Sequence, residues 1–140
     1  MRAIGRFMFR IIRIDFVIRT RLLGEGTWAI ALYPFIFVNR RNRCTQRLLL
    51  HERIHLAQQR ELLILPFYIW YALEYGYNLL VYRHQDTAYR NISFEREAYY
   101  GEQFPDYLLK RRTFAFFPFH FRRKPAEPSK GRKTRKNAYK

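Results

Sequence analysis

Two histidines and a glutamate stand together near the middle of the chain, in the segment His51-Glu52-Arg53-Ile54-His55. Side chains four residues apart lie on the same face of a helix, so both imidazoles can reach one metal ion. In zinc-dependent proteases two histidines at this spacing bind zinc, and the glutamate after the first one takes a proton from a water molecule. The pattern therefore predicts His51 and His55 as metal ligands and Glu52 as a general base.

Two histidines need a third protein ligand to complete such a site. In the metzincin class, a glycine and a third histidine stand at the positions that Gln58 and Glu61 occupy here, so the sequence excludes that class. The remaining option is an acidic residue further along the chain. The candidates are Glu61, Glu74, Glu95, Glu97 and Glu102.

The positions of these acids separate them. Glu61 lies on the motif helix itself and would have to point back along it. Glu74 follows at a distance that suits a helix–turn–helix, and a glutamate in an apolar helix needs a partner such as a metal or an arginine. Glu95 begins an independent helix. Glu97 comes two residues later and points to the far side of that helix, where a solvated or salt-bridged role suits it.

The segment Glu95–Tyr99, with the sequence Glu-Arg-Glu-Ala-Tyr, resembles the Glu-x-x-Ala-Asp element of gluzincins, which are zinc peptidases with two His and one Glu as ligands. The run His-Glu-x-x-His-x-x-Gln-Gln also resembles bacterial metallopeptidase domains, and residues 27–112 resemble a group of small bacterial zincin-like proteins. This resemblance implies Glu95 as the third ligand and Zn²⁺ as the cofactor. Tyr99 departs from the family pattern, because the acid at this position supports a ligand histidine, and that partner stays unassigned here.

A peptidase also needs a hydrogen-bond donor for the negative charge that develops on the attacked carbonyl oxygen. Tyr99 lies one helical turn after Glu95 on the same face, and we predict it as this donor. Tyr100 and His84 are the alternatives.

The elements that position these residues are predicted as a mainly α (α+β) fold, a minimal zincin-like helical core with a small edge strand or hairpin. Residues 27–38 are rich in aromatic and β-branched residues, and Pro34 makes them an edge strand or two short strands. Residues 39–46 form a polar loop, in which Thr45 is the predicted N-cap of the motif helix. That helix runs from about Gln46 to Leu65.

Further helices follow the motif helix. Pro66 interrupts or restarts it, and residues 67–82 form a second, strongly apolar helix that we predict to be buried in the core. Residues 83–90 are predicted as a polar connection, and Ser93 opens the helix that carries Glu95. Asp106 is predicted to cap a short basic segment. The aromatic residues 114–121 pack against the domain or a membrane.

The chain carries a net charge of +16, and the charge is concentrated at its two ends. Residues 1–24 are predicted to form a basic amphipathic helix. The apolar face of this helix either lies on a membrane surface or packs against the domain. Residues 122–140 contain nine Lys and Arg against one Glu, which predicts a disordered tail with non-specific contact to nucleic acid or anionic lipid. Residues 25–121 form the predicted zincin-like core between them.

Three features of the sequence indicate the cellular compartment of the protein. Residues 62–82 are long enough to span a bilayer, but Glu74 in their middle and several tyrosines argue against spanning. The N-terminus lacks the apolar run and cleavage site of a signal peptide. The single cysteine, Cys44, excludes an internal disulfide and is predicted to be a free surface thiol. We expect a cytoplasmic protein with possible membrane association.

Two functions follow from these observations. The first is a zinc-dependent metallopeptidase that acts on a peptide or protein substrate through a zinc-activated water and Glu52. The second is a non-catalytic zinc-binding or membrane-associated protein that keeps a zincin scaffold.

Overall fold

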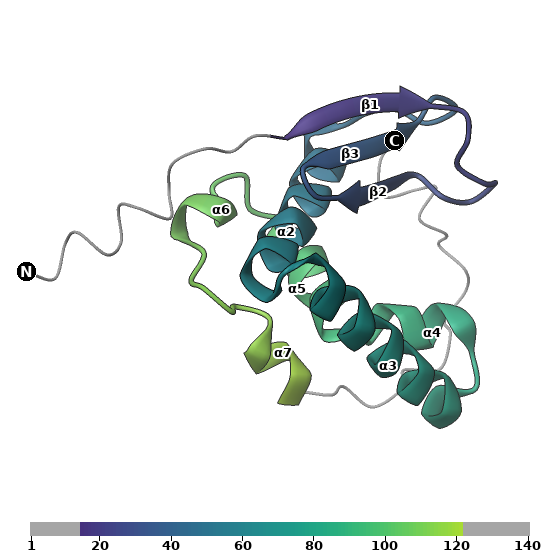
Figure 1. Cartoon of the computed structure of the whole chain (residues 1–140), viewed down its shortest axis with the longest axis vertical. Helices are drawn as coiled ribbons and strands as arrows, with labels where there is room; N and C mark the ends of the chain where they lie inside the picture. Colours follow the sequence, from purple (N-terminus) through teal and green to yellow (C-terminus); the bar gives the residue numbers. More distant parts are fainter. Residues whose placement is uncertain (1–14, 122–140) are drawn as a thin grey trace, which may run out of the picture.

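The computed structural model describes residues 15–121, and it arranges them as a group of helices with a small sheet on one side (Figure 1). The predicted fold class, mainly α with a small sheet, is confirmed. The helix predicted for residues 1–14 and the tail predicted for residues 122–140 lie outside the described part of the chain.

The sheet has three strands in the order β1-β3-β2. Strand β1 (Phe16–Thr20) lies parallel to β3 (Phe35–Asn39), and β2 (Ala29–Leu32) lies antiparallel to β3. The peptide bond between Tyr33 and Pro34 is cis, and these two residues make the turn between β2 and β3. The predicted break at Pro34 is therefore confirmed, and the segment forms a hairpin.

The helix predicted for residues 1–24 is wrong at Phe16–Thr20, which form β1 instead. The apolar residues between the arginines indicated a helix, but Val17 and Ile18 are β-branched and suit a strand. The deciding contact is with β3, which follows later in the chain and pairs with all five residues of β1. Tertiary pairing of this kind overrides a weak local helical pattern.

The motif helix is α2 (Gln46–Leu62), and Thr45 caps it as predicted because its Oγ1 accepts a hydrogen bond from the Leu48 backbone N–H at 3.1 Å. Leu48 and Leu56 on one side of α2 pack against the inner face of the sheet. The helix ends three residues earlier than predicted, because Leu63 has a positive φ of 66° and the next helix starts at once. Pro66 lies in the first turn of that helix, where proline is tolerated, so the predicted restart is confirmed.

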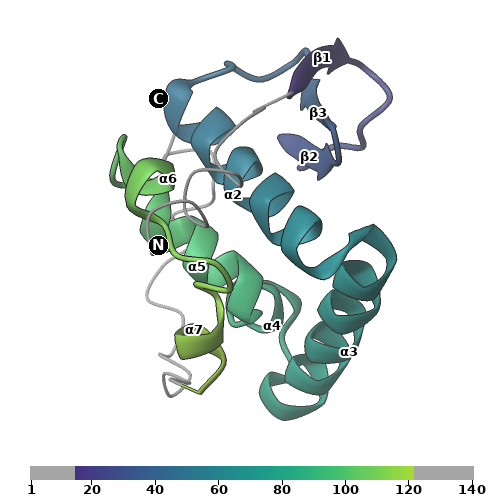
Figure 2. The same cartoon turned by 60° about the vertical axis from the view of Figure 1, so that its left-hand side comes forward.

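The remaining helices are α3 (Ile64–Tyr82), α4 (Gln85–Arg90), α5 (Ser93–Gly101), α6 (Tyr107–Lys110) and α7 (Phe117–Phe121). Figure 2 shows α2 passing between the sheet and α5, with α3 and α4 side by side below. A second apolar core joins α3 to α5 and to the aromatic segment after residue 113. This core contains Phe67, Ile92, Phe94 and Phe116. The predicted packing of the aromatic segment against the domain is therefore confirmed.

Two predictions about the middle of the chain are wrong. Residues 85–90 form α4 where we predicted a loop, since the His84 side chain caps the helix and Arg90 pairs with Asp86 one turn earlier. Helix α3 was predicted to be a buried core helix, but it buries only Phe67, Glu74 and Asn78 and leaves its other apolar side exposed. Within residues 15–121, no helix is both long and apolar enough to cross a membrane.

Candidate metal centre

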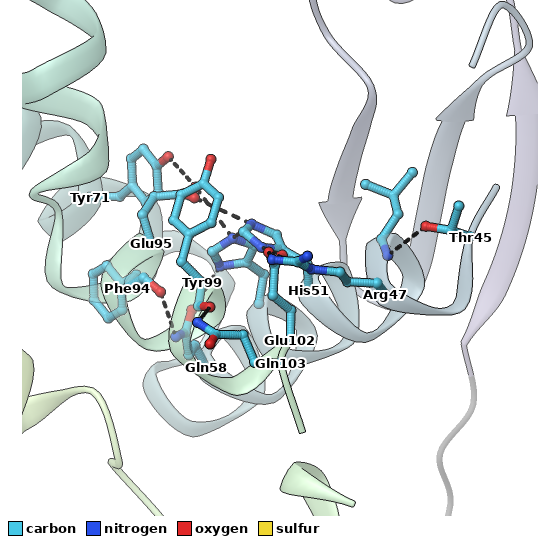
Figure 3. A network of polar contacts seen from close by, with 12 residues as sticks. Thr45, Arg47, His51, Gln58, Tyr71, Phe94, Glu95, Tyr99, Glu102 and Gln103 are labelled. Atoms are coloured by element: carbon cyan, nitrogen blue, oxygen red, sulfur yellow. Dashed lines mark hydrogen bonds and ion pairs between the residues drawn. The ribbon is translucent and has the colours of Figure 1, made fainter. Parts of the chain in front are cut away.

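The two motif histidines and Glu95 lie together between α2 and α5 (Figure 3). The Nε2 atoms of His51 and His55 are 3.2 Å apart. Each of these nitrogens is 3.3 Å from a different carboxylate oxygen of Glu95. All three side chains are buried. The group His51–His55–Glu95 could therefore hold a metal ion.

The spacing of this group suits one shared metal ion, because the two imidazole nitrogens lie 3.2 Å apart and each is 3.3 Å from one oxygen of the Glu95 carboxylate. The Oε2 atom of Glu95 is buried and lies 3.3 Å from His51 Nε2, but among the described residues it accepts no hydrogen bond of good geometry. A buried, unsatisfied carboxylate oxygen is costly, and a metal ion would satisfy it.

A close approach of two helices brings Glu95 to the histidines. Gly101 at the end of α5 lies against Ile54 of α2, between the two histidines in the sequence. A Cβ atom at Gly101 would come 2.7 Å from the Ile54 Cδ1 and 2.6 Å from the Tyr107 Cδ1, so the Ile54 and Tyr107 side chains would have to move to admit it. The glycine therefore lets α5 pack against the motif helix.

Glu102 orients His51. Its Oε2 accepts a hydrogen bond from the His51 Nδ1 at 2.8 Å, and its Oε1 accepts two from the Arg47 guanidinium at 2.8 and 3.0 Å. A carboxylate on one ring nitrogen turns the other one toward the metal position. Sequence reasoning considered Glu102 only as a ligand and missed this role, although two helical turns separate it from Glu95.

This contact also controls the protonation of His51. Burial alone would lower the pKa of His51, but the hydrogen bonds to Glu102 and Glu95 outweigh it and raise the pKa to about 9. Burial would likewise raise the pKa of Glu95, yet the nearby His55 and His51 hold it well below its ordinary value. The Glu95 carboxylate is therefore ionised at neutral pH.

Gln58 orients His55. Its Oε1 accepts a hydrogen bond from the His55 Nδ1 at 2.8 Å, and its Nε2 donates to Glu97 Oε2 at 2.9 Å and to the Phe94 carbonyl at 3.1 Å. Glu97 is fully buried, so the solvated role is wrong and the salt-bridged role is confirmed: it pairs with Arg111. The histidine partners that the resemblance left unassigned are thus Glu102 and Gln58.

The other acidic candidates lie outside the metal group. Glu74 accepts hydrogen bonds from the Ser93 backbone N–H at 3.0 Å and from its hydroxyl at 2.7 Å, so it holds the start of α5. Glu61 forms an ion pair with Arg111. Both acids support the helices around the site without reaching the histidines' Nε2 atoms.

Glu52, the predicted base, follows His51 on α2 and is only 3% exposed. Its charge contributes to the raised pKa of His51, after the larger effects of burial and of Glu102 and Glu95. It also contributes to the raised pKa of Tyr68, after the larger effect of burial.

Two tyrosines, Tyr99 and Tyr71, contact residues of the metal group, whereas Tyr100 does not. The Tyr99 ring meets the His51 ring edge-on with centroids 4.9 Å apart, so the predicted donor does lie beside the site. Tyr100 is turned toward Phe104 and is exposed, and His84 caps α4, so neither alternative joins the metal group. Tyr71 of α3, which sequence reasoning missed, donates a hydrogen bond to Glu95 Oε1 at 2.8 Å (Figure 3). No residue spacing in the sequence signals this contact, because α3 and α5 are separate helices.

Comparison with known protein families, curated proteins and solved structures finds no match to this chain. Any functional statement therefore rests on the chemistry of the site itself.

Proposed function

We propose that the protein is a zinc-dependent metallopeptidase of the gluzincin type, which hydrolyses peptide bonds with Glu52 as the general base. The observation that carries the proposal is the convergence of His51 Nε2, His55 Nε2 and the Glu95 carboxylate at separations of 3.2–3.3 Å. Two imidazoles and one carboxylate form a common ligand set of catalytic zinc, which leaves a fourth position for water or substrate.

The roles of the protein side chains follow from their positions. Zinc, when bound, supplies a Lewis acid that lowers the pKa of a water molecule and polarises a carbonyl group. Glu52, which follows His51 on α2, would act as the base that takes a proton from water and passes it to the leaving amine. Glu102 and Gln58 keep the two histidines in the orientation that binding requires. Burial of Glu52 strengthens its electrostatic effect on the reacting atoms.

An extended peptide could reach this group along β2. This strand is at an edge of the sheet, so a peptide can add to it as a further strand. The Gln59 side chain already occupies one part of the edge, because its Oε1 accepts from the Tyr33 N–H at 2.8 Å and its Nε2 donates to the Ala31 carbonyl at 2.9 Å. Substrate pairing would therefore use the backbone that precedes Ala31.

The donor for the developing negative charge is a choice between two hydroxyl groups. Tyr99 lies against His51, and Tyr71 bonds directly to a ligand oxygen of Glu95. We expect Tyr99→Phe to lower kcat by about 100-fold while KM and zinc content stay unchanged, as for loss of one such donor. Loss of activity in Tyr71→Phe but not in Tyr99→Phe would assign the role to Tyr71.

The test combines metal analysis with hydrolysis of a diverse peptide library. The wild-type chain and Glu52→Gln are expected to retain one zinc per chain, whereas His51→Ala is expected to lose it. Of these three chains, only the wild type should cleave peptides. Glu25→Gln, a matched change at an exposed residue, should cleave as wild type does. A chain that never retains stoichiometric zinc would refute the proposal.

A second function is favoured by the burial of the whole site, since His51, His55, Glu95 and Glu52 are all covered by protein. A covered metal suits a zinc ion that stabilises a non-catalytic protein on a zincin scaffold. Full zinc retention together with no cleavage in the wild-type chain would support this function over the first.

A further inference from the structure

Helix α3 turns Phe67 and its buried polar residues toward the protein and leaves a second apolar side exposed. Its only charged residue, Glu74, is buried, and so is Asn78 one turn later. The exposed side carries no charge along the whole length of the helix. Its large exposed side chains are Ile64, Leu65, Tyr68, Ile69, Leu73, Tyr77, Leu80 and Val81.

The polar contacts fix this orientation. Glu74 accepts two hydrogen bonds from Ser93 at the start of α5, and the Asn78 amide donates to the Ala88 carbonyl of α4 at 3.2 Å. Rotating α3 to hide its leucines would break these buried hydrogen bonds and leave a carboxylate without partners, which is costly. The apolar side therefore stays exposed in the folded domain.

The exposed apolar side of α3 is larger than the single apolar residues that are scattered over most protein surfaces. Leu65, Leu73 and Leu80 are 70%, 70% and 79% exposed, and they are spread along a helix of 19 residues. At 1.5 Å per residue the helix is about 28 Å long. Figure 2 shows α3 at the margin of the molecule, with other elements on one side of it only. Continuous apolar surfaces of this size mark contacts with a protein or a membrane.

Charge decides between these partners. The chain carries +16, so two copies that met through α3 would repel each other, whereas an anionic lipid surface would attract the protein. Arg60 and Arg83 stand just before and just after α3 in the sequence, and both are exposed. Long cationic side chains at the ends of an apolar helix can reach lipid headgroups, and Tyr77 is of the type enriched at membrane interfaces.

We infer that the outer face of α3 binds the surface of an anionic lipid bilayer, with the helix lying in the plane of the interface. This is a binding site in addition to the metal centre, and it does not depend on zinc or on peptidase activity.

The first test measures co-sedimentation of the full chain with vesicles. We expect binding to phosphatidylcholine vesicles that contain about 30% phosphatidylserine, and much weaker binding to phosphatidylcholine alone. Leu73→Glu and Leu80→Glu should each weaken binding by about tenfold or more, since each places a charge where apolar surface would be buried. Leu22→Glu is the matched control, because Leu22 is 94% exposed and lies outside α3. It should bind as wild type does.

The result that overturns the inference is equal binding of all three variants, because the basic ends of the chain would then account for it. Equal binding to neutral and anionic vesicles would overturn the choice of an anionic surface. A dimer in solution that Leu73→Glu converts to a monomer would assign the face to a second copy of the chain.

A second measurement guards against variants that fail to fold. Cys44 is the only cysteine and is exposed, so an environment-sensitive dye can be attached at a single position. The dye on Leu73→Cys in a Cys44→Ser background should shift to shorter wavelength when anionic vesicles are added. The same dye on Cys44 of the wild-type chain should not shift. A shift at Cys44 alone would contradict the inference.

Discussion

The affinity for zinc should depend on pH through one identified proton, the proton of His51. The His51 ring lies between two carboxylates, with Nδ1 2.8 Å from Glu102 and Nε2 3.3 Å from Glu95. These contacts outweigh burial, which alone would lower the pKa, and raise it from 6.5 to about 9. In the metal-free protein His51 is therefore protonated at neutral pH, and a metal ion must displace this proton.

The size of the effect follows from that pKa. At pH 7 the imidazole is about two pH units below its pKa, so about 1 molecule in 100 has a free Nε2 lone pair. Zinc affinity should then rise about tenfold per pH unit and about 100-fold between pH 7 and pH 9, where it levels off. Glu95 adds no slope in this range, because its pKa is held well below its ordinary value.

The stability of the metal-free protein should change in the opposite direction. Because the folded pKa of His51 is above the unfolded value of 6.5, the protonated ring stabilises the fold fully below about pH 6.5. This contribution is lost as the pH rises through about 9. Chemical unfolding at pH 6 and pH 9 should therefore show a less stable metal-free protein at pH 9, and a zinc-loaded protein with a smaller difference.

The assay is competition with a zinc chelator of known affinity at constant ionic strength, with calorimetry in two buffers to count released protons. Glu102→Gln is the critical variant, because it keeps the shape of the side chain and removes its charge. It should bind zinc about 10–100-fold more weakly at pH 9 and show a much flatter profile. A wild-type affinity that is constant from pH 7 to pH 9, or an unchanged slope in Glu102→Gln, would refute the reasoning.

Three further predictions concern the support of the site, and each is checked by urea unfolding of the metal-free protein. Gly101→Ala should destabilise the fold by about 1–3 kcal/mol, because the new Cβ would press on the Ile54 and Tyr107 side chains. Gly76→Ala should stabilise the fold by about 0.5–1 kcal/mol, because Gly76 is within a helix and a Cβ there would have no atom within 4 Å. Stability changes of the same sign in both variants would contradict the packing argument. Leu63 has a positive φ of 66° and is 69% exposed, so Leu63→Gly should raise the free energy of unfolding or leave it unchanged. A clear loss of stability would show that the backbone at Leu63 is unstrained. Arg111→Met should cost about 3–5 kcal/mol because it leaves the buried Glu97 and the partly buried Glu61 without a counter-charge. Arg112→Met, at the exposed neighbour, should change stability by less than about 0.5 kcal/mol, and similar losses in both variants would argue against this ion-pair network.

The ligand group was accessible from the sequence because helical spacing and a resemblance both act on short segments. His51 and His55 followed from their four-residue spacing, and Glu95 followed from the Glu-x-x-Ala resemblance. The structure brings these three together. Thr45 as a helix cap and Pro34 as a break between strands were also predictable, since capping and proline geometry are local.

The rest depended on contacts between distant segments. Strand β1 depends on pairing with β3, and the packing of α5 against α2 brings Glu102 to His51 and Glu97 to Gln58. Helix α3 was misjudged because its apolar composition indicates burial, whereas its orientation is set by Glu74 and the start of α5. Composition reports how apolar a helix is, but only packing determines which side of it meets the protein.

Gln58 and Gln59 are neighbours on α2, and they reach in opposite directions. Gln58 holds the ligand His55 and binds the α5 side, while Gln59 bonds to Ala31 and Tyr33 on β2. One step of helix backbone thus joins the support of the metal group to the edge strand. If a peptide pairs with β2, its offset from the metal is set by strand register in whole residues, so the bond that is cut would be chosen by position along the strand as well as by side-chain type.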